Sequence, residues 1–470
     1  MPCHFTGQSG AAFAFQFHLM SETTLSAADA PTLRLAATPC PAETPRPPGA
    51  GPAPRTSARV WLLALVLLAV GAFIRIHPSA GFTGVGFDEH LYQRYVVLLN
   101  AKGLSAYPAF CDYFLEEQTK GGICELPPTR FLYIFCGSAW CQLFGPGGLG
   151  EPGPAANAAA LAALKSVSCL FAILTLIPSA LFARRLRGDG AMLGTLALMC
   201  FAPVQIHLAQ HRMIDGFFAF WALMCLWLLW ENLRAPNHAG WLAGLTVCLG
   251  AMVMTKENAF FVFIALGGLV VLNRWGKWGT VTPKLLLCMI AGPLTGLALL
   301  VTLAGGTENF LHIYKLLVAK AQTLDYAIRT GDGPWYRYFV DYMLVSPVVL
   351  ILAIGGFFST ARENRPLLYL AAFMACSYVL MCNVKYGMNL RYTTIWDMPL
   401  RLLAVAQLAA LTQRFGPRQP LALGVLIAAV CGYELRQYVI LFHDAALYEL
   451  VPGGLLFALK FLKGASPVIQ

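Results

Sequence analysis

Two adjacent carboxylates, Asp88 and Glu89, are the residues of this 470-residue chain whose types and position most strongly suggest chemistry. They lie in GVGFDEHLYQRY, directly after the first long apolar segment. Charged residues make up only 12% of the chain. A carboxylate pair beside a membrane span needs water, a cation or a substrate to satisfy it. Neighbours in a helix do not share a face, so we expect the two carboxylates to have different roles.

The pair has two interpretations on sequence alone. In the first, one carboxylate accepts a proton from an attacking group, while the other holds a cation, a sugar hydroxyl or a nearby arginine such as Arg94. In the second, the pair only stabilises the start of the helix that FDEHLYQRY begins, because acidic side chains are favourable in a first helical turn. The sequence leaves both interpretations open.

A second candidate group, His211, Arg212 and Asp215, lies in AQHRMIDGFF at a boundary between two apolar segments. The alternative is that Arg212 and Asp215 only pair with each other across one helical turn, which stabilises a helix by about 0.2–0.5 kcal/mol.

A third candidate is Arg130, in CELPPTRFLYI. Its planar donor fork suits a phosphate, but an arginine at a membrane interface is also a common structural feature. Further groups stand at the ends of other apolar segments: Lys256 and Glu257 in MTKEN, and Arg391 and Tyr392 in GMNLRYTT.

The elements that must position these residues are membrane-spanning helices. Apolar residues form 58% of the chain, the mean hydropathy is +0.62, and apolar runs recur from Trp61 almost to the C-terminus. This composition is typical of an all-α polytopic membrane protein. The net charge of +10 comes mostly from basic residues in short loops, which positive-inside topology explains without a nucleic-acid partner.

Charge parity assigns each loop to a side of the membrane. Arg55 and Arg59 place the start of the first span in the cytoplasm, and the cluster from Arg184 to Arg187 should also lie inside. Both basic groups can lie on the cytoplasmic side if residues 131–144 form a helix at the outer interface and do not cross the membrane. About eleven spans are then expected, at residues 60–76, 159–183, 190–209, 214–231, 240–255, 258–273, 283–304, 341–360, 366–382, 394–412 and 420–435.

These spans divide the chain into three parts. Residues 1–58, rich in Ala, Pro and Thr, are predicted to be a disordered cytoplasmic tail, in which Met20 is an alternative start. Residues 59–435 form the membrane domain, and residues 436–470 form an outer C-terminal segment. The larger outer loops are 77–158 and 305–340, and the first carries interfacial helices. All the candidate residues named above fall on the outer side.

Most of the fourteen cysteines lie inside apolar segments, where they behave as small hydrophobic residues, and no zinc spacing appears. Cys111 and Cys124 lie in the first outer loop, where a disulfide between them is an alternative if that side is oxidising. Asp88, Glu89 and Asp215 could together hold a divalent cation, but carboxylates alone do not identify a metal, and we predict no definite cofactor.

The order and side of these motifs resemble the GT-C polytopic glycosyltransferases of the protein O-mannosyltransferase type, which include the bacterial aminoarabinose transferase of lipid A. The resemblance covers about residues 60 to 400. It rests on five features: the Asp88-Glu89 pair after the first span, the step Pro127-Pro128, the turn from Arg212 to Asp215, the turn at Thr255-Lys256, and Arg391-Tyr392 late in the chain.

The resemblance implies transfer of a sugar from a polyprenyl-phosphate donor to a lipid, glycan or protein acceptor on the outer face of a bacterial inner membrane. It makes Asp88 the catalytic carboxylate, with Glu89 and Asp215 shaping its site. An acceptor hydroxyl deprotonated by Asp88 would displace the polyprenyl phosphate with inversion, while basic residues such as Arg130 neutralise the phosphate. The remaining candidates, which by this reading line the substrate site, are His211, Arg212, Lys256, Glu257, Arg391 and Tyr392.

One position departs from the pattern. Many bacterial relatives have Lys-Pro-Pro at the Pro-Pro step, whereas this chain has Leu126, so we expect Arg130 or Lys120 to take the place of that lysine. Two other functions stay as alternatives. One is a polytopic transporter, although no inverted repeat is evident. The other is a lipid-linked glycan ligase or polymerase, which usually has its largest outer loop late in the chain.

Overall fold

The computed structural model contains helices and no strands within the residues it describes, which are 57–77, 85–119, 126–145, 152–323, 331, 333–359, 364–384 and 388–448. The predicted all-α membrane fold is confirmed. Nearly all of the predicted tail lies outside the described residues, as do Lys120, Cys124 and the chain after residue 448. The disordered tail and the Cys111–Cys124 disulfide therefore stay predictions.

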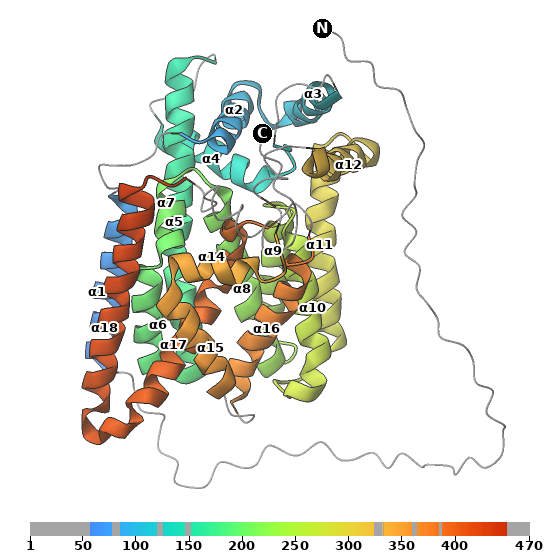
Figure 1. Cartoon of the computed structure of the whole chain (residues 1–470). Helices are drawn as coiled ribbons and strands as arrows, with labels where there is room; N and C mark the ends of the chain where they lie inside the picture. The colour runs from blue at the N-terminus through green and yellow to red at the C-terminus, as the bar shows by residue number, and fades with distance from the viewer. Residues whose placement is uncertain are drawn as a thin grey trace, which may run out of the picture. The chain divides into compact units, whose positions relative to one another are not determined.

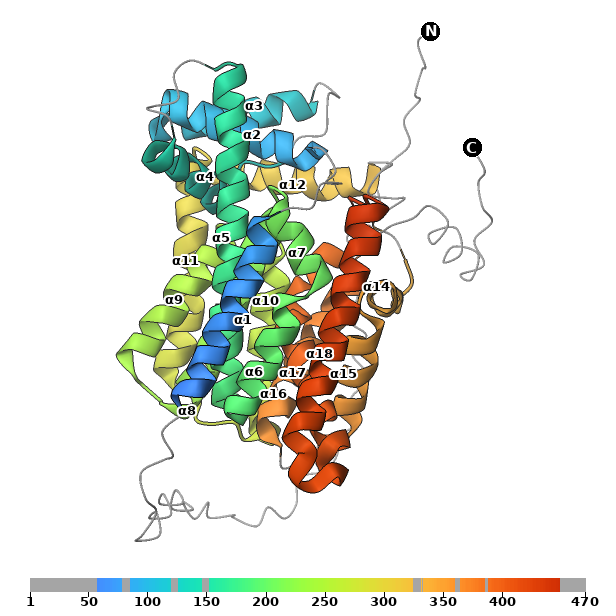
Figure 2. The ribbon, with the colours of Figure 1, turned by 90° about the vertical axis from the view of Figure 1, so that its left-hand side faces the viewer.

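Largely apolar helices form a bundle in which they lie side by side (Figures 1 and 2). They are α1 (Ala58–Ile76), α5 (Pro154–Arg187), α6 (Asp189–Cys200), α7 (Pro203–Gln210), α8 (Ile214–Arg234), α9 (Ala239–Val253), α10 (Ala259–Gly276), α11 (Pro283–Leu303), α15 (Pro347–Ser359), α16 (Arg365–Met381), α17 (Asp397–Thr412) and α18 (Gln419–Tyr438). Helix α5 extends beyond its neighbours at one end of the bundle, and α2 and α4 pack against it.

Shorter helices gather at this same end of the bundle (Figure 1). They are α2 (Phe87–Lys102), η1 (Leu104–Ala106), α3 (Tyr107–Thr119), α4 (Phe131–Phe144) and α12 (Thr307–Thr323). Helix α4, which was predicted to lie at the membrane interface, is one of them. Because α2 begins at Phe87, this end of the bundle also carries Asp88 and Glu89.

Each predicted span coincides with helical structure, but the predicted number of crossings is not settled by length. Within the described ranges, six helical segments are long and apolar enough to cross a membrane, when the stretch Leu390–Asp444 is taken as one. The pair α6 and α7 adds a seventh, while α9, α15 and α16 are shorter apolar helices. The stretch Leu390–Asp444 itself contains η2 (Leu390–Trp396), α17, η3 (Gln413–Arg418), α18 and the π-helical turn η4 (Val439–Asp444). Eleven crossings therefore stay a prediction.

Two predicted spans are interrupted by proline. The span 190–209 is bent by 54° between α6 and α7, where Pro203 opens the second helix. The span 341–360 is not one helix, because α14 (Arg337–Val345) ends before Ser346 and α15 begins at Pro347. A residue that precedes proline is disfavoured in the helical conformation, and Ser346 has φ −138° and ψ 56°. Apolar composition alone did not reveal either break.

The bend between α6 and α7 is stabilised by Arg75, a fully buried residue near the end of α1. Its guanidinium donates to the carbonyl oxygens of Met199 at 2.9 Å and Cys200 at 3.0 Å, and also to that of Gly71 in its own helix. Carbonyl groups freed by a helix break need such partners inside a membrane, where no water replaces them. These hydrogen bonds therefore stabilise the bend, which directs α7 toward the Asp88 end of the bundle.

Candidate active site

Arg391 joins the carboxylates of two helices. Its Nη1 lies 3.3 Å from Oδ2 of Asp88, in the first turn of α2, and 4.0 Å from Oδ2 of Asp215, in the first turn of α8. Arg391 itself stands at the start of η2, where the side chain of Asn389 accepts a hydrogen bond from its backbone N–H at 3.0 Å. Residues far apart in the sequence thus meet at one point at the Asp88 end of the bundle.

Asp215 is the more enclosed of these two carboxylates. Its side chain is 3% exposed, against 28% for Asp88, and it forms an ion pair with Lys256 in the turn between α9 and α10. The ammonium of Lys256 also lies 4.1 Å from the ring centre of Tyr392, a cation–π contact. With two cations beside it, Asp215 is suited to hold Lys256 and Arg391 in place.

Glu89 is fully buried between two basic residues of the turn that precedes α8. Nδ1 of His211 lies 2.6 Å from Oε1 of Glu89, and Nη1 of Arg212 donates to Oε2 at 3.0 Å. Burial alone would raise the pKa of Glu89, but the hydrogen bonds and charges of His211 and Arg212 lower the pKa below its ordinary value. Both carboxylate oxygens are engaged, so Glu89 serves to fix α2 against the start of α8.

Arg130 and Glu257 form a further ion pair. The Nε and Nη2 atoms of Arg130 donate to the carboxylate of Glu257 at 3.1–3.2 Å, and Nη1 donates to the hydroxyl of Tyr92 at 2.6 Å. Burial favours the neutral form of Glu257, yet the charge of Arg130 outweighs it and lowers the pKa of this carboxyl. A backbone hydrogen bond of 2.9 Å from Leu132 to Met254 attaches α4 to the same turn.

We call these charged residues together the Asp88 cluster. It contains four ion pairs, which are Asp88 with Arg391, Glu89 with Arg212, Asp215 with Lys256, and Glu257 with Arg130. The structure thus brings together all ten candidate residues, since His211 contacts Glu89 and Tyr392 contacts Lys256. Arg94 lies elsewhere, with its guanidinium 4.7 Å from the ring centre of Tyr113.

Two simpler interpretations gave these residues only local roles: Asp88 and Glu89 in starting a helix, and Arg212 and Asp215 in pairing with each other. Asp88 and Glu89 contact side chains from other parts of the chain, which a purely local role in starting a helix would not require. Arg212 donates to Glu89, and Asp215 lies beside Lys256 and Arg391, so tertiary partners take the place of the local pair. Asp88 is the most exposed carboxylate of the cluster, and this makes it the one best placed to meet a substrate.

Sequence reasoning missed two tyrosines of the site. Tyr92 stands one helical turn after Asp88, a spacing that puts both on one face of α2 and could have indicated it. Burial raises the pKa of Tyr92. Tyr448, near the end of the described chain, donates to Sδ of Met213 at 3.2 Å, and no pattern in the sequence around it suggested that it reaches this site.

The donor set of the cluster does not fit a bound divalent cation. Among the described residues, no group of three or more histidines, cysteines, aspartates and glutamates is placed to hold a metal ion. Arg391 and Lys256 occupy the positions beside Asp88 and Asp215 that a metal would need, and Glu89 binds His211 and Arg212. We therefore derive no chemistry from a metal.

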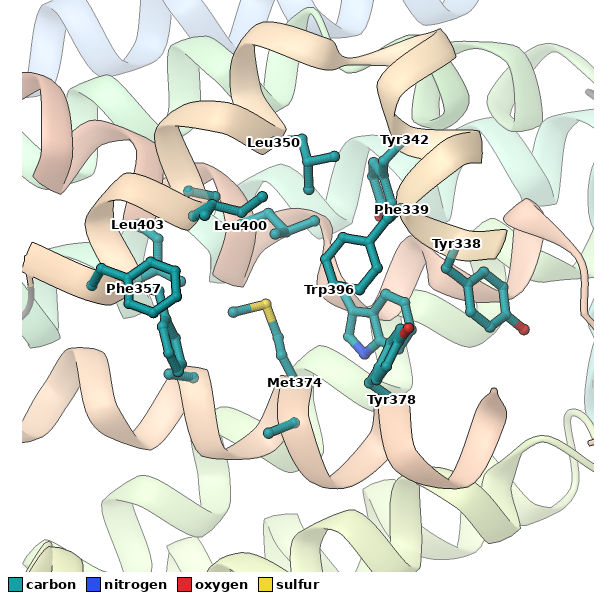
Figure 3. Close-up of a pocket in the computed structure, with 15 residues that line it drawn as sticks. Tyr338, Phe339, Tyr342, Leu350, Phe357, Met374, Tyr378, Trp396, Leu400 and Leu403 are labelled. Carbon is teal, nitrogen blue, oxygen red and sulfur yellow. The ribbon is translucent and has the colours of Figure 1, made fainter. Parts of the chain in front are cut away.

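An apolar groove of about 360 Å³ lies between α14, α15, α16 and α17. Figure 3 shows Phe357 and Leu403 toward one end, and Tyr338, Tyr378 and Trp396 toward the other. The ring of Trp396 contacts both tyrosine rings, with centres 5.5 and 5.9 Å away. The short helix η2 connects the groove with the cluster, because Arg391 stands near its start and Trp396 at its end.

Comparison with known proteins identifies the fold. Residues 153–314 match the family model described as dolichyl-phosphate-mannose-protein mannosyltransferase. No curated protein sequence matches the chain.

Solved structures that are similar to this chain include two enzymes. The apo oligosaccharyltransferase of Archaeoglobus fulgidus has a TM-score of 0.55 and 12% identity, over 81% of this chain and 55% of that one. Apo ArnT from Cupriavidus metallidurans has a TM-score of 0.48 and 18% identity, over 85% of this chain and 67% of that one. This chain thus spans about half the length of the archaeal enzyme. The resemblance to GT-C glycosyltransferases that the sequence predicted is confirmed.

Proposed function

We propose that this protein is a membrane glycosyltransferase that moves a sugar from a polyprenyl-phosphate donor to an acceptor hydroxyl of a protein, lipid or glycan. The observation that carries the proposal is the contrast within the Asp88 cluster. Among the described residues, Asp88 is partly exposed and contacts one cation, whereas Glu89 and Asp215 are buried and each has two partners. The match to a mannosyltransferase family model over 153–314 supports the same reaction class.

In the proposed mechanism Asp88 is the general base. It takes the proton of the acceptor hydroxyl as the acceptor oxygen forms a bond to the anomeric carbon of the sugar. The bond from that carbon to the phosphate oxygen breaks, and the polyprenyl phosphate leaves with the electron pair. A single displacement of this kind inverts the anomeric carbon. The charge on the leaving phosphate requires a cation more than an acid, and Arg391 stands beside Asp88 to supply it.

Asp215 and Lys256 act on this chemistry through Arg391. Asp215 lies 4.0 Å from Nη1 of Arg391 and is itself paired with Lys256, which fixes its position. A cation held in place before the reaction stabilises developing charge without a cost of reorganisation. We assign Asp215, Lys256 and Glu89 as positioning residues.

The apolar groove is suited to the donor's isoprenoid chain. Its lining is almost wholly aliphatic and aromatic, and burial of hydrocarbon there is favourable by about 0.8 kcal/mol for each CH₂ group. Because η2 joins the groove to Arg391, a lipid whose phosphate lies at the cluster can extend its chain toward Trp396. This placement keeps the donor's charge at the cluster and its chain among apolar side chains.

We place the cluster on the outer face of a bacterial inner membrane, with the N-terminus in the cytoplasm. Arg184, Arg185 and Arg187 stand in the last turn of α5, whose 34 residues span about 51 Å, and α2 and α4 pack near its other end. Positive-inside topology puts the arginines in the cytoplasm, and therefore the cluster outside.

The test is sugar transfer by the full chain in lipid nanodiscs. Donors are polyprenyl phosphates carrying one sugar, and polyprenyl diphosphates carrying an oligosaccharide, which separates the proposed reaction from glycan ligation. Asp88→Asn keeps the shape of the side chain and removes the base, so we expect transfer to fall about 10²–10⁴-fold at an unchanged melting temperature.

The matched control is Asp112→Asn, which alters an exposed carboxylate of α3 that accepts a hydrogen bond from Asn309. This variant should transfer at the wild-type rate. Wild-type transfer by Asp88→Asn with any lipid-linked donor would overturn the assignment of the base.

A further inference from the structure

The sulfur of Met213 receives two donors at the centre of the site. The hydroxyl of Tyr448 donates to Sδ at 3.2 Å, and Nη1 of Arg391, which also donates to Oδ2 of Asp88 at 3.3 Å, lies 3.7 Å from the same sulfur. A thioether is a weak hydrogen-bond acceptor, whereas a phenol and a guanidinium are strong donors. Two strong donors that converge on a weak acceptor favour its replacement by a charged oxygen.

Tyr448 is held at this point by contacts from three elements. Its backbone carbonyl accepts a hydrogen bond from Nε2 of His207 at 3.0 Å, and its ring stands edge-on to His211 with centres 5.1 Å apart. The ring also lies against Gly86, where a Cβ atom would come within 2.2 Å of it. Only glycine at the N-cap of α2 leaves room for Tyr448 beside the helix that carries Asp88.

Of the two residues expected to take the place of the phosphate-contacting lysine, Lys120 lies outside the described residues and Arg130 is engaged by other side chains. Position 126 is leucine, and its backbone carbonyl accepts a hydrogen bond from Tyr95. Arg130, the candidate for that role, directs its donors to Glu257 and Tyr92. A phosphate is a charged group rich in acceptor oxygens, which matches a position surrounded by donors better than a sugar hydroxyl does.

We propose that Tyr448 and Arg391 bind the phosphate group of the donor, with a phosphate oxygen replacing Sδ of Met213 as their acceptor. The identity of the lipid in this inference rests on the proposed function. The binding of a phosphate group does not. Tyr448 is then a substrate-binding residue that the C-terminal segment brings to the site from outside the region matched by the family model.

Binding of geranylgeranyl phosphate to the full chain in detergent micelles tests this proposal, with geranylgeraniol as the matched lipid without phosphate. Tyr448→Phe removes only the hydroxyl. We expect it to weaken binding of the phosphate about tenfold, since a hydrogen bond to a charged group is lost, and to leave binding of the alcohol unchanged. The control Tyr433→Phe removes a hydroxyl of α18 that accepts from Gln437, and it should bind both lipids as the wild type does.

Two further variants keep the proposal testable if Tyr448→Phe folds poorly. Gly86→Ala places a methyl group where the ring of Tyr448 lies, so it should weaken binding of geranylgeranyl phosphate to a similar degree. Met213→Leu removes the sulfur but neither donor, so it should bind the phosphate at least as tightly as the wild type.

Inorganic phosphate separates the headgroup from the lipid. Competition by inorganic phosphate against geranylgeranyl phosphate in the wild type, reduced in Tyr448→Phe, supports a site for the phosphate itself. Equal binding of geranylgeranyl phosphate by the wild type and Tyr448→Phe would overturn the proposal, and so would equal weakening of the phosphate and the alcohol. Absence of sugar transfer with every donor would defeat the proposed function but leave the difference in phosphate binding intact.

Discussion

The Asp88 cluster and a second ionic group, centred on Arg401, use the same residue types but differ in the exposure of one carboxylate, Asp88. We call the second group the Arg401 network: Arg401 and Asp397 of α17, Glu434 of α18, Ser346 and Gln205. Arg401 donates to Asp397 at 2.7 Å and to Glu434 at 3.1 Å, and these three side chains are at most 3% exposed. Asp88, by contrast, is 28% exposed.

The two groups also differ in where their charged side chains find partners. In the network, Arg401 also donates to the carbonyl oxygen of Leu198 in α6, and Ser346 donates to Glu434 at 2.8 Å. The protein itself thus supplies the partners that hold α6, α17 and α18 together. In the cluster, Asp88 contacts one arginine and faces solvent. Buried charge in a membrane core serves the fold, whereas partly exposed charge at a helix end can serve a substrate.

Removal of Arg401 should produce the largest effect on stability. Arg401→Met leaves Asp397 and Glu434 buried without their cation, so we expect a loss of about 3–5 kcal/mol in the free energy of unfolding. Denaturant titration of the purified protein measures this loss. The triple variant R401M/D397N/E434Q removes all three charges and should recover much of it. Full stability of Arg401→Met alone would break the distinction between the two groups.

The variant Asp215→Asn tests the Asp88 cluster, as Arg401→Met tests the Arg401 network. It removes a charge that positions Arg391 and Lys256 while keeping the shape of the side chain. Because a misplaced catalytic group can cost about 10²-fold in rate, we expect kcat to fall by about that factor, with a smaller change in KM. Steady-state transfer assays measure both constants. If Asp215→Asn lowered stability as much as Arg401→Met and left kcat unchanged, Asp215 would belong with the structural group.

Glu89 gives the smallest expected effect, and it tests whether a carboxylate of the cluster also supports the fold. The pKa of Glu89 in the folded protein is lowered, so its contribution to stability is present above the ordinary glutamate pKa of about 4.3. That contribution is lost as the pH falls through the folded pKa. The melting temperature of the wild type should therefore drop more steeply on acidification below about pH 5 than that of Glu89→Gln. Parallel curves for the two proteins would remove Glu89 from this role.

Particular residues show how far sequence reasoning reached into the site. Asp88, Asp215, Lys256 and Arg391 could be picked out because charge is scarce in this chain and each stands beside an apolar segment. Charge parity then predicted a common side for them, and the ion pairs show that they do meet. The pairing itself was not predictable. Arg130 was, with Lys120, a residue expected to meet phosphate; in the folded chain its donors go to Glu257 and Tyr92, and its role toward phosphate stays a prediction.

The sequence by itself determined that this is a helical membrane protein and which residues are candidates for its chemistry, because hydropathy and charge along the chain fix both. Tertiary structure alone decided the roles within that set. It buried Glu89, left Asp88 partly exposed, and brought Tyr448 against Gly86. The physical reason is that the burial and the partners of a side chain depend on how helices far apart in the sequence pack together. Local sequence patterns do not contain that information.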